Sequence, residues 1–166
     1  MNITDIFGAQ DLKLGSMADK KPNNGWSNKR TGAEMRNIIA EQIPALGTLT
    51  DRIQKAAKRG YLIGLDGRKL IVRSQHAALN LYIQGTGALV MKTSICFLDD
   101  WVRQYGFDVI KVGDFHDEAQ ADVLPEHAEI YGGLAVKSII KAGEYWNLNC
   151  PMDGEYKIGN SWAETH

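Results

Sequence analysis

Cysteine and proline are scarce in this sequence, and long hydrophobic runs are missing. It has 2 cysteines and 4 prolines among 166 residues. Cys96 and Cys150 lack the spacing of paired metal ligands or of a disulfide framework, and Cys96 falls in an apolar helical pattern that predicts a buried thiol. No signal peptide is visible, and no apolar run approaches the ~18 residues of a membrane span. The sequence therefore predicts a cytosolic protein in a reducing compartment, with no membrane partner.

An excess of charge of one sign is also missing, since the formal net charge is −1. The charges are unevenly distributed: 12 of the 19 basic residues lie between Lys20 and Arg73, together with only 4 of the 20 acidic residues. That stretch therefore carries a net charge of +8, and the remainder carries −9. A basic half joined to an acidic half favours a polyanion surface beside a cation site, although a mixed soluble surface would give the same totals.

Apolar residues, at 44% of the chain, are sufficient for a packed core. Their periodicity predicts helices packed on a small antiparallel sheet, which is an α+β architecture. We expect helices over residues 32–42, 44–59, 76–105 and 125–146. We expect strands at 61–73 (a hairpin), 107–115, 119–123 and 150–158.

Local signals define several of these boundaries. Thr31 and Glu34 have the spacing of a capping box, which predicts that a helix begins at the next residue after the threonine. Pro44 disfavours helix at the residue before it, so the helical pattern is broken there and restarts. Asp66 and Gly67 predict a tight type I′ turn, in which both central residues have positive φ. Within the long helix, Gly85 and Gly87 indicate a place where another segment approaches closely.

His116, Asp117 and Glu118 stand at the bend between two predicted strands. A bend projects side chains past the edge of a sheet, and adjacent carboxylates there can hold a hard cation such as Mg²⁺. Aspartate is also common at turns for purely conformational reasons, and an isolated histidine is more often an ordinary surface or core residue. The spacing alone leaves both interpretations open.

Three stretches in this order carry a resemblance to a known family: Gly64–Asn80, Gln84–Lys92 and Phe115–Gln120. They resemble the C-terminal region of family A (DNA polymerase I-like) DNA polymerases, most closely the replicative enzymes of short-tailed phages. The final residues, Gly159–His166, resemble the C-terminus of that family. The match is good from Tyr61 onward and weaker before it.

The resemblance implies a partial polymerase palm with finger helices. Residues 1–60 would form the C-terminal part of the fingers, and residues 61–166 the C-terminal part of the palm. The implied function is template-directed nucleotidyl transfer by a DNA-directed DNA polymerase, with primer–template DNA and a dNTP as partners. If the protein is phage-encoded, it would act in the cytoplasm of the infected bacterium.

The resemblance also implies roles for individual residues. Asp117 matches one of the two aspartates that hold a pair of Mg²⁺ ions, and Glu118 matches its acidic neighbour. His116 matches a residue near the primer terminus, and Phe7 lies at the weakly matching end of the nucleotide-binding finger helix. Two groups of residues would contact the duplex: Asn80 and Gln84 in the minor groove, and Arg68, Lys69, Arg73 and His76 near the backbone.

Several parts of the family pattern are missing from this sequence. The first polymerase motif, with the other metal-binding aspartate, is absent, and so are the finger-helix Arg and Lys that bind the triphosphate. Ile3 aligns near the family's stacking tyrosine, and Asp114 adds a carboxylate at what we expect is a solvent-facing strand position. One aspartate cannot hold two metals.

We therefore expect a fragment or a split-polymerase subunit that works with a partner carrying the first motif. The initial Met1 and the family-like ending favour a separate subunit. The alternatives are a non-catalytic DNA-binding accessory subunit and a metal-dependent nuclease using His116, Asp117 and Glu118.

Overall fold

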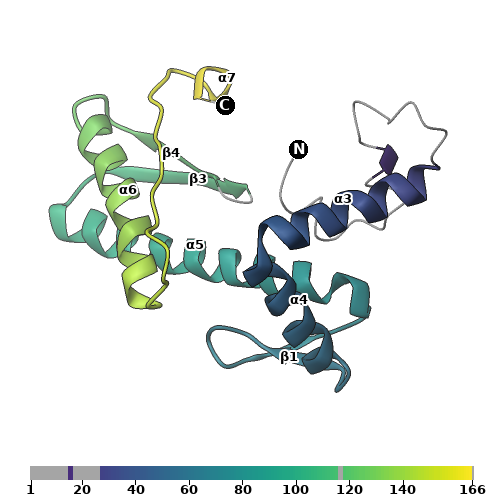
Figure 1. The fold of residues 1–166 in the computed structure, drawn as a ribbon. Coiled ribbons are helices and arrows are strands. Elements are labelled where there is room, and N and C mark those ends of the chain that lie inside the picture. The colour runs from purple at the N-terminus through teal and green to yellow at the C-terminus, as the bar shows by residue number, and fades with distance from the viewer. Residues whose placement is uncertain (1–14, 17–26, 116–117, 166) are drawn as a thin grey trace. The chain divides into compact units, whose positions relative to one another are not determined.

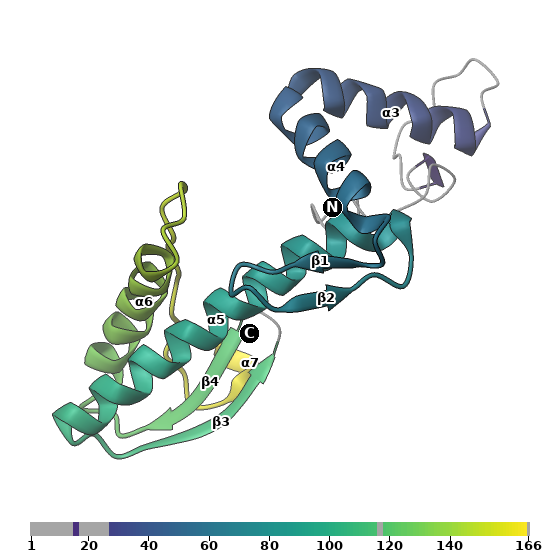
Figure 2. The same ribbon diagram turned by 90° about the horizontal axis from the view of Figure 1, so that it is seen from below.

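Helices make up most of the chain, and short antiparallel strand pairs lie between them (Figures 1 and 2). The computed structural model describes residues 15–16, 27–115 and 118–165. The elements in chain order are α3 (Asn28–Gln42), α4 (Pro44–Ala57), β1 (Tyr61–Ile63), β2 (Lys69–Ile71), the 3₁₀ helix η1 (Gln75–Ala77), α5 (Ala78–Tyr105), β3 (Val109–Phe115), β4 (Glu118–Val123), α6 (Ala128–Tyr145) and α7 (Trp162–Thr165). This mixture confirms the predicted α+β class.

The chain divides into two units, residues 1–85 and 86–166, and the division falls inside α5. Within the described residues, β1 pairs antiparallel with β2 in the first unit, and β3 pairs antiparallel with β4 in the second. Both hairpins were expected from the sequence, and both are confirmed.

The core of the first unit lies where α4, the β1–β2 hairpin and the start of α5 meet. Its buried members are Ile53, Ala57, Leu62, Ala78 and Leu79. The close approach expected near the helix glycines is not found among the described residues. A Cβ at Gly85 would lie 3.4 Å from Cδ1 of Leu70, an ordinary van der Waals distance, and one at Gly87 would meet nothing within 4 Å.

The start of α3 differs from the prediction. The N-cap is Ser27, whose Oγ accepts a hydrogen bond from the Arg30 backbone N at 3.4 Å. Thr31 lies inside the helix, where its hydroxyl donates to the Ser27 carbonyl oxygen at 3.3 Å. The capping box was therefore wrong, because a serine four residues earlier offers the same capping chemistry. Pro44 begins α4, as expected, since its missing N–H costs nothing at a first helical position.

The β1–β2 turn also differs from the predicted type I′ turn. Gly67 has φ of 82°, but Asp66 is not among the residues with positive φ. The Gly67 N–H donates to the Gly64 carbonyl at 3.0 Å, and the Gly64 N–H donates to the Arg68 carbonyl at 2.8 Å. This is a three-residue loop, a type I turn followed by a left-handed glycine, so only the glycine needs positive φ.

The predicted last strand, residues 150–158, is not a strand. The segment instead runs without regular hydrogen bonding along α6, and we call it the C-terminal strap (Figure 1). A Cβ at Gly132 would come within 2.3 Å of the Tyr156 ring, and one at Gly143 within 2.5 Å of Met152 Cγ. Both side chains thus occupy space that only a glycine leaves open.

Helix α6 begins at Ala128, after a turn that is closed by a hydrogen bond of 2.9 Å from the His127 N–H to the Leu124 carbonyl.

Cys96 is exposed, which corrects the predicted buried thiol. Ser94 and Leu98 are the buried residues on this part of α5. Cys96 lies two positions from each, and in a helix with 3.6 residues per turn that places it on the opposite side.

The segment Gln75–Tyr105 is long and apolar enough to cross a membrane by length and composition, with a mean hydropathy of 1.2 and 17% of the apolar window buried. The core helix of a soluble protein passes the same test.

Candidate metal-binding hairpin and nucleic-acid interface

Glu118, the one residue of the predicted acidic motif that the structure describes, begins the second strand of the β3–β4 hairpin. Phe115 pairs with Glu118 at the end of the antiparallel register, so the chain turns back between them. The register shifts between Lys111 and Gly113, which is a β-bulge. Both predicted strands are confirmed. His116 and Asp117, the residues between Phe115 and Glu118, lie outside the described residues.

Glu118 begins β4, and its carboxylate is held from one side. Its Oε1 accepts a hydrogen bond from Nε2 of Gln120, two residues along the strand. A carboxylate fixed in this way suits a hard cation, because hard cations need oxygen ligands. Mg²⁺ usually takes only one or two carboxylates from the protein. Within residues 15–16, 27–115 and 118–165, no group of three His, Cys, Asp or Glu side chains could hold a metal. Glu118 is the one residue of the predicted metal motif that the structure describes.

Asp114 faces solvent, as expected, and forms an ion pair with Lys111 between Oδ2 and Nζ. Its charge also reaches α6: burial, and secondarily the negative charge of Asp114, raise the pKa of Tyr131 above its usual value. The Asp114 carboxylate is thus already partly neutralised, which separates it from the carboxylates of the predicted metal motif.

The β1–β2 hairpin presents Arg68 and Lys69 at the surface of the first unit. Arg68 forms an ion pair with Asp66 through its Nε, and its backbone N–H donates to the same carboxylate at 3.2 Å. Desolvation acts to raise the pKa of Asp66, but the hydrogen bonds and charge of Arg68 outweigh it, and the pKa is lowered. Arg68 is therefore partly neutralised within its own turn.

Tyr61 carries two cations against its ring. The Arg59 guanidinium carbon lies 4.7 Å from the ring centroid and the Lys69 Nζ lies 4.8 Å from it. Cations at this distance are held electrostatically by the ring. Neither Arg59 nor Tyr61 was among the predicted contact residues, although the sequence places a basic residue two positions before an aromatic residue at the start of a strand.

Arg73 and His76 are exposed at the start of the helical segment that follows β2. Gln84 is exposed on α5, and Asn80 lies four residues earlier, on the same face of the helix. Asn80 is half-buried, and its Oδ1 is shielded from solvent without a hydrogen-bond partner among the described residues. A duplex contact by the Asn80 oxygen therefore requires the side chain to rotate.

All the residues predicted to contact DNA except His116 belong to the first unit. Phe7, which was predicted to bind the nucleotide, lies outside the described residues.

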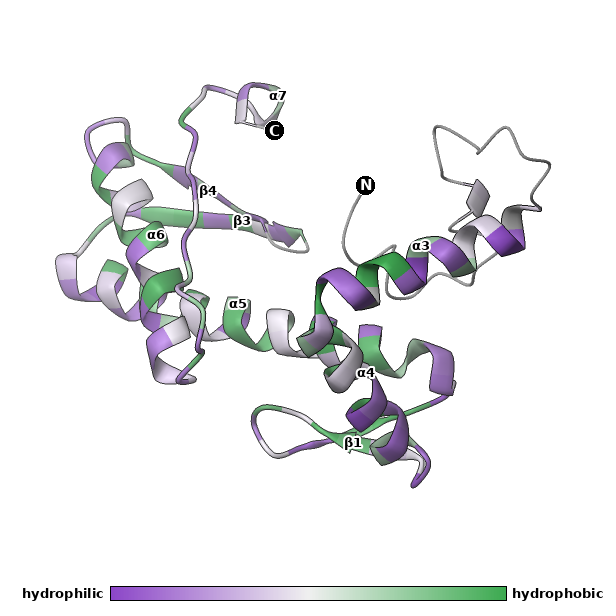
Figure 3. Cartoon of the chain, viewed as in Figure 1, coloured by the Kyte–Doolittle hydropathy of each residue, from purple (hydrophilic) through white to green (hydrophobic). Residues whose placement is uncertain are grey.

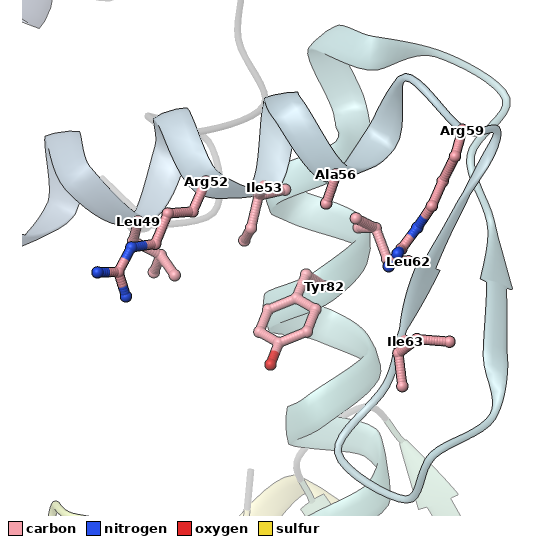
Figure 4. Close-up of a pocket in the computed structure, with 8 residues that line it drawn as sticks. All are labelled: Leu49, Arg52, Ile53, Ala56, Arg59, Leu62, Ile63 and Tyr82. Carbon is pink, nitrogen blue, oxygen red and sulfur yellow. The ribbon is translucent and has the colours of Figure 1, made fainter.

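The first unit also contains an apolar pocket of about 240 Å³ (Figure 4). Figure 4 shows Tyr82 of α5 opposite Ile53 of α4, with Leu62 and the side chain of Arg59 beside them. The lining residues are Leu49, Arg52, Ile53, Ala56, Arg59, Leu62, Ile63 and Tyr82. None of the residues predicted to contact DNA lines this pocket.

Comparisons with known proteins account for this arrangement. The POL domain of Pol1 from M. smegmatis, solved in complex with a DNA primer-template and a dNTP, matches with a TM-score of 0.71 over 96% of this chain and 29% of that chain, at 18% sequence identity. The fold is therefore that of part of a polymerase domain. The family model "DNA polymerase family A" matches residues 37–164.

The chain belongs to DNA polymerase family A. A DNA-directed DNA polymerase of Escherichia phage Phieco32 is 38% identical, and the match covers 96% of this chain and 26% of the phage protein. A DNA-directed DNA polymerase of Enterobacteria phage T3 is 32% identical, with 97% of this chain and 25% of the phage protein covered. The chain thus spans about a quarter of the length of these relatives, and the family resemblance inferred from the motifs is confirmed.

Proposed function

We propose that this chain is the C-terminal part of a DNA-directed DNA polymerase and takes part in template-directed nucleotidyl transfer in a bacterial cytoplasm. One observation carries the proposal. The family match includes the β3–β4 hairpin, whose register reverses the chain between Phe115 and Glu118. We assign Asp117, which lies between these two residues in the sequence, as the metal-binding aspartate. Residues 1–60 are assigned to the fingers and residues 61–166 to the palm.

The proposed role of the hairpin is to hold a metal. Family A DNA polymerases generally use Mg²⁺, and Asp117 and Glu118 are the residues that would hold it here. When bound, the ions activate the primer 3′ oxygen and stabilise the charge on the leaving pyrophosphate. Gln120 fixes the orientation of Glu118 through its hydrogen bond, and His116 is assigned a place near the primer terminus.

The proposed DNA surface combines a helix face and a basic hairpin. Asn80 and Gln84, one turn apart on α5, would meet the minor groove, which presents acceptors common to all base pairs and allows pair shape to be checked without reading sequence. Arg68, Lys69, Arg73 and His76 are exposed and would lie near the duplex backbone. Phe7 is assigned to the end of the dNTP-binding finger helix.

A second polypeptide segment completes the enzyme in this proposal. The first polymerase motif and its aspartate are absent from the sequence, and the chain spans about a quarter of its relatives' length. On β3, Ile110 and Val112 are 64% and 65% exposed, and Figure 3 shows both apolar and polar colour along this strand. Among the described residues β3 pairs only with β4. A strand with exposed apolar side chains and an open edge is a surface that another strand covers in permanent complexes.

The test is co-expression with the product of an adjacent polymerase-like gene, followed by size-exclusion chromatography and primer extension. The two chains should co-elute and extend primers only together. Ile110→Asp should prevent co-elution, whereas Ile71→Asp, at a β2 residue that is 66% exposed, should not. A monomer that extends primers alone, or a pair that never associates, would contradict the split enzyme.

The same experiments separate the other candidate functions. A non-catalytic accessory subunit would bind DNA and leave extension intact when Asp117 is replaced by alanine. A nuclease would cleave DNA alone in the presence of Mg²⁺ or Mn²⁺. The family match favours the polymerase over both.

A further inference from the structure

The ring of Phe115 contacts the C-terminal tail and lies close to a glycine of its own strand. Its centroid is 4.8 Å from that of Trp162, with 31° between the ring planes. A Cβ at Gly113 would come within 2.9 Å of the Phe115 Cε2 atom. Phe115 is the last described residue before Asp117, and it pairs with Glu118 across the hairpin. The contact thus acts on the end of β3 from which the chain continues to the metal motif.

Trp162 is brought to this position by contacts along the tail. In the strap, Tyr156 donates a hydrogen bond from its hydroxyl to Oε2 of Glu129 at 2.7 Å. Further along, the Asn160 backbone N–H donates to Oε2 of Glu164 at 2.8 Å and begins the short helix α7. The first hydrogen bond attaches the tail to α6, and the second, within the tail, orders the short segment that contains Trp162.

The contact contributes little to a core. Trp162 is 50% exposed and Phe115 is 42% exposed, whereas the buried members of this unit, such as Leu98 and Ala142, lie on its helices. A half-exposed aromatic pair at the tip of a hairpin chiefly restricts the direction of the strand end. Precise placement of catalytic ligands depends on such supporting contacts.

We propose that Trp162 is a positioning residue for the tip of the β3–β4 hairpin: its indole packs on the Phe115 ring and so restrains the strand ends at Phe115 and Glu118. This inference rests on the proposed function for the role of Asp117. The contact itself and its effect on the turn do not depend on that role, and both can be measured on this chain alone.

The first experiment is hydrogen exchange on the full chain. Trp162→Ala should accelerate exchange of the backbone amides around Phe115 and Glu118 several-fold, and Trp162→Phe should restore most of the protection. The matched control is Tyr145→Ala, which removes a 60% exposed aromatic residue at the far end of α6, where it contacts Phe97 at 5.9 Å between ring centroids. Unchanged exchange at the hairpin in Trp162→Ala would overturn the proposal, as would equal acceleration in the control.

The second experiment is primer extension by the two-chain enzyme, with Asp117→Ala as reference. Trp162→Ala should lower kcat about tenfold, since small misplacements of catalytic groups are costly. It should raise the Mg²⁺ concentration for half-maximal rate and leave the Kd for primer–template nearly unchanged. An unchanged kcat and Mg²⁺ requirement would overturn the inference, as would a loss of DNA affinity that matches the loss of rate. Activity retained in Asp117→Ala would instead overturn the proposed function, whatever the hydrogen-exchange result.

Discussion

The indole Nε1 of Trp146, at the end of α6, donates a hydrogen bond to Oγ1 of Thr93 on α5 at 2.9 Å, joining residues 53 positions apart. The Thr93 hydroxyl also donates to the Leu89 carbonyl at 2.9 Å. The part-buried Thr93 hydroxyl accepts one hydrogen bond and donates another, so both the hydroxyl and the indole N–H are satisfied. The two helices that carry the β3–β4 hairpin between them are thus joined at this point by polar chemistry as well as by apolar contact.

Thr93→Val should destabilise the second unit, because it keeps the shape of the side chain and leaves the indole N–H without its acceptor. We expect a loss of about 1–3 kcal/mol in the free energy of unfolding, measured by urea denaturation. The control is Thr48→Val, since the Thr48 hydroxyl bonds only within its own helix, to the Pro44 carbonyl at 3.2 Å. Equal losses in the two variants would contradict the cross-helix role.

Asp117→Ala should abolish nucleotide incorporation by the assembled enzyme and leave duplex affinity within a few-fold. A lost metal ligand removes stabilisation of the transition state and not of the bound ground state. Glu118→Ala should be milder. Asp114→Ala is the control, because that carboxylate is paired with Lys111, and it should extend primers normally. Single-turnover rates and equilibrium binding, measured on the same preparations, separate these outcomes.

Replacing Arg68, Lys69 and Arg73 together by alanine should weaken primer–template binding and flatten its dependence on salt. For every phosphate that the variant no longer neutralises, the slope of log K against log salt should fall by about 0.9. The control removes three exposed lysines of the second unit, Lys137, Lys141 and Lys157. An unchanged slope in the hairpin variant would show that β1 and β2 face away from DNA.

Asp66→Asn should strengthen DNA binding, because it frees Arg68 from its ion pair. The folded-state pKa of Asp66 is lowered from 3.8. Its contribution to stability is therefore present above that value and is lost only as the pH falls through the lower, folded pKa. Lowering the pH within the physiological range does not release Arg68, so the substitution is the practical test. A steeper salt slope in Asp66→Asn is the expected measurement; a shallower one would contradict the assignment of Arg68 to the duplex.

Gln84→Ala should lower extension from mismatched termini and from templates modified in the minor groove more than extension from matched ones. The reason is that the proposed contact reads the shape of the base pair and adds little to overall affinity. Gln104→Ala, at another exposed glutamine of α5, is the control. Equal loss on all templates would indicate a general structural effect of the Gln84 substitution.

Much of the fold followed from local chemistry in the sequence. The helix over 76–105, observed at 78–105, the restart at Pro44 and the strands on either side of Asp117 were predicted because period and turn residues agree there. The start of α3 was not, because Ser27 and Thr31 are equally good caps and the sequence does not rank them. The tight turn at Asp66 was misread because Asp-Gly also suits a type I turn with a bulge, in which only Gly67 takes positive φ.

The errors near the C-terminus have a different origin. Residues 150–158 alternate like a strand, but no neighbouring strand lies beside them within the described chain, and Met152 and Tyr156 instead pack over Gly143 and Gly132 of α6. Such tertiary contacts override a local pattern. The pairing of Phe115 with Trp162 was equally hidden, since two aromatics 47 positions apart carry no periodic signal. The roles assigned to the site residues, Phe7, His116 and Asp117 among them, stay predictions.

The packing of Met152 and Tyr156 on α6 determines how many residues the tail needs to run along the helix. An extended chain advances about 3.3 Å per residue, and a helix advances about 1.5 Å. Four residues of the strap, from Met152 to Tyr156, therefore travel nearly as far as the eleven residues of α6 between Gly143 and Gly132, in the opposite direction. The tail retraces the helix in far fewer residues than the helix used. An added or deleted residue between Tyr156 and Trp162 would thus shift the indole by about one strand residue, enough to miss the Phe115 ring.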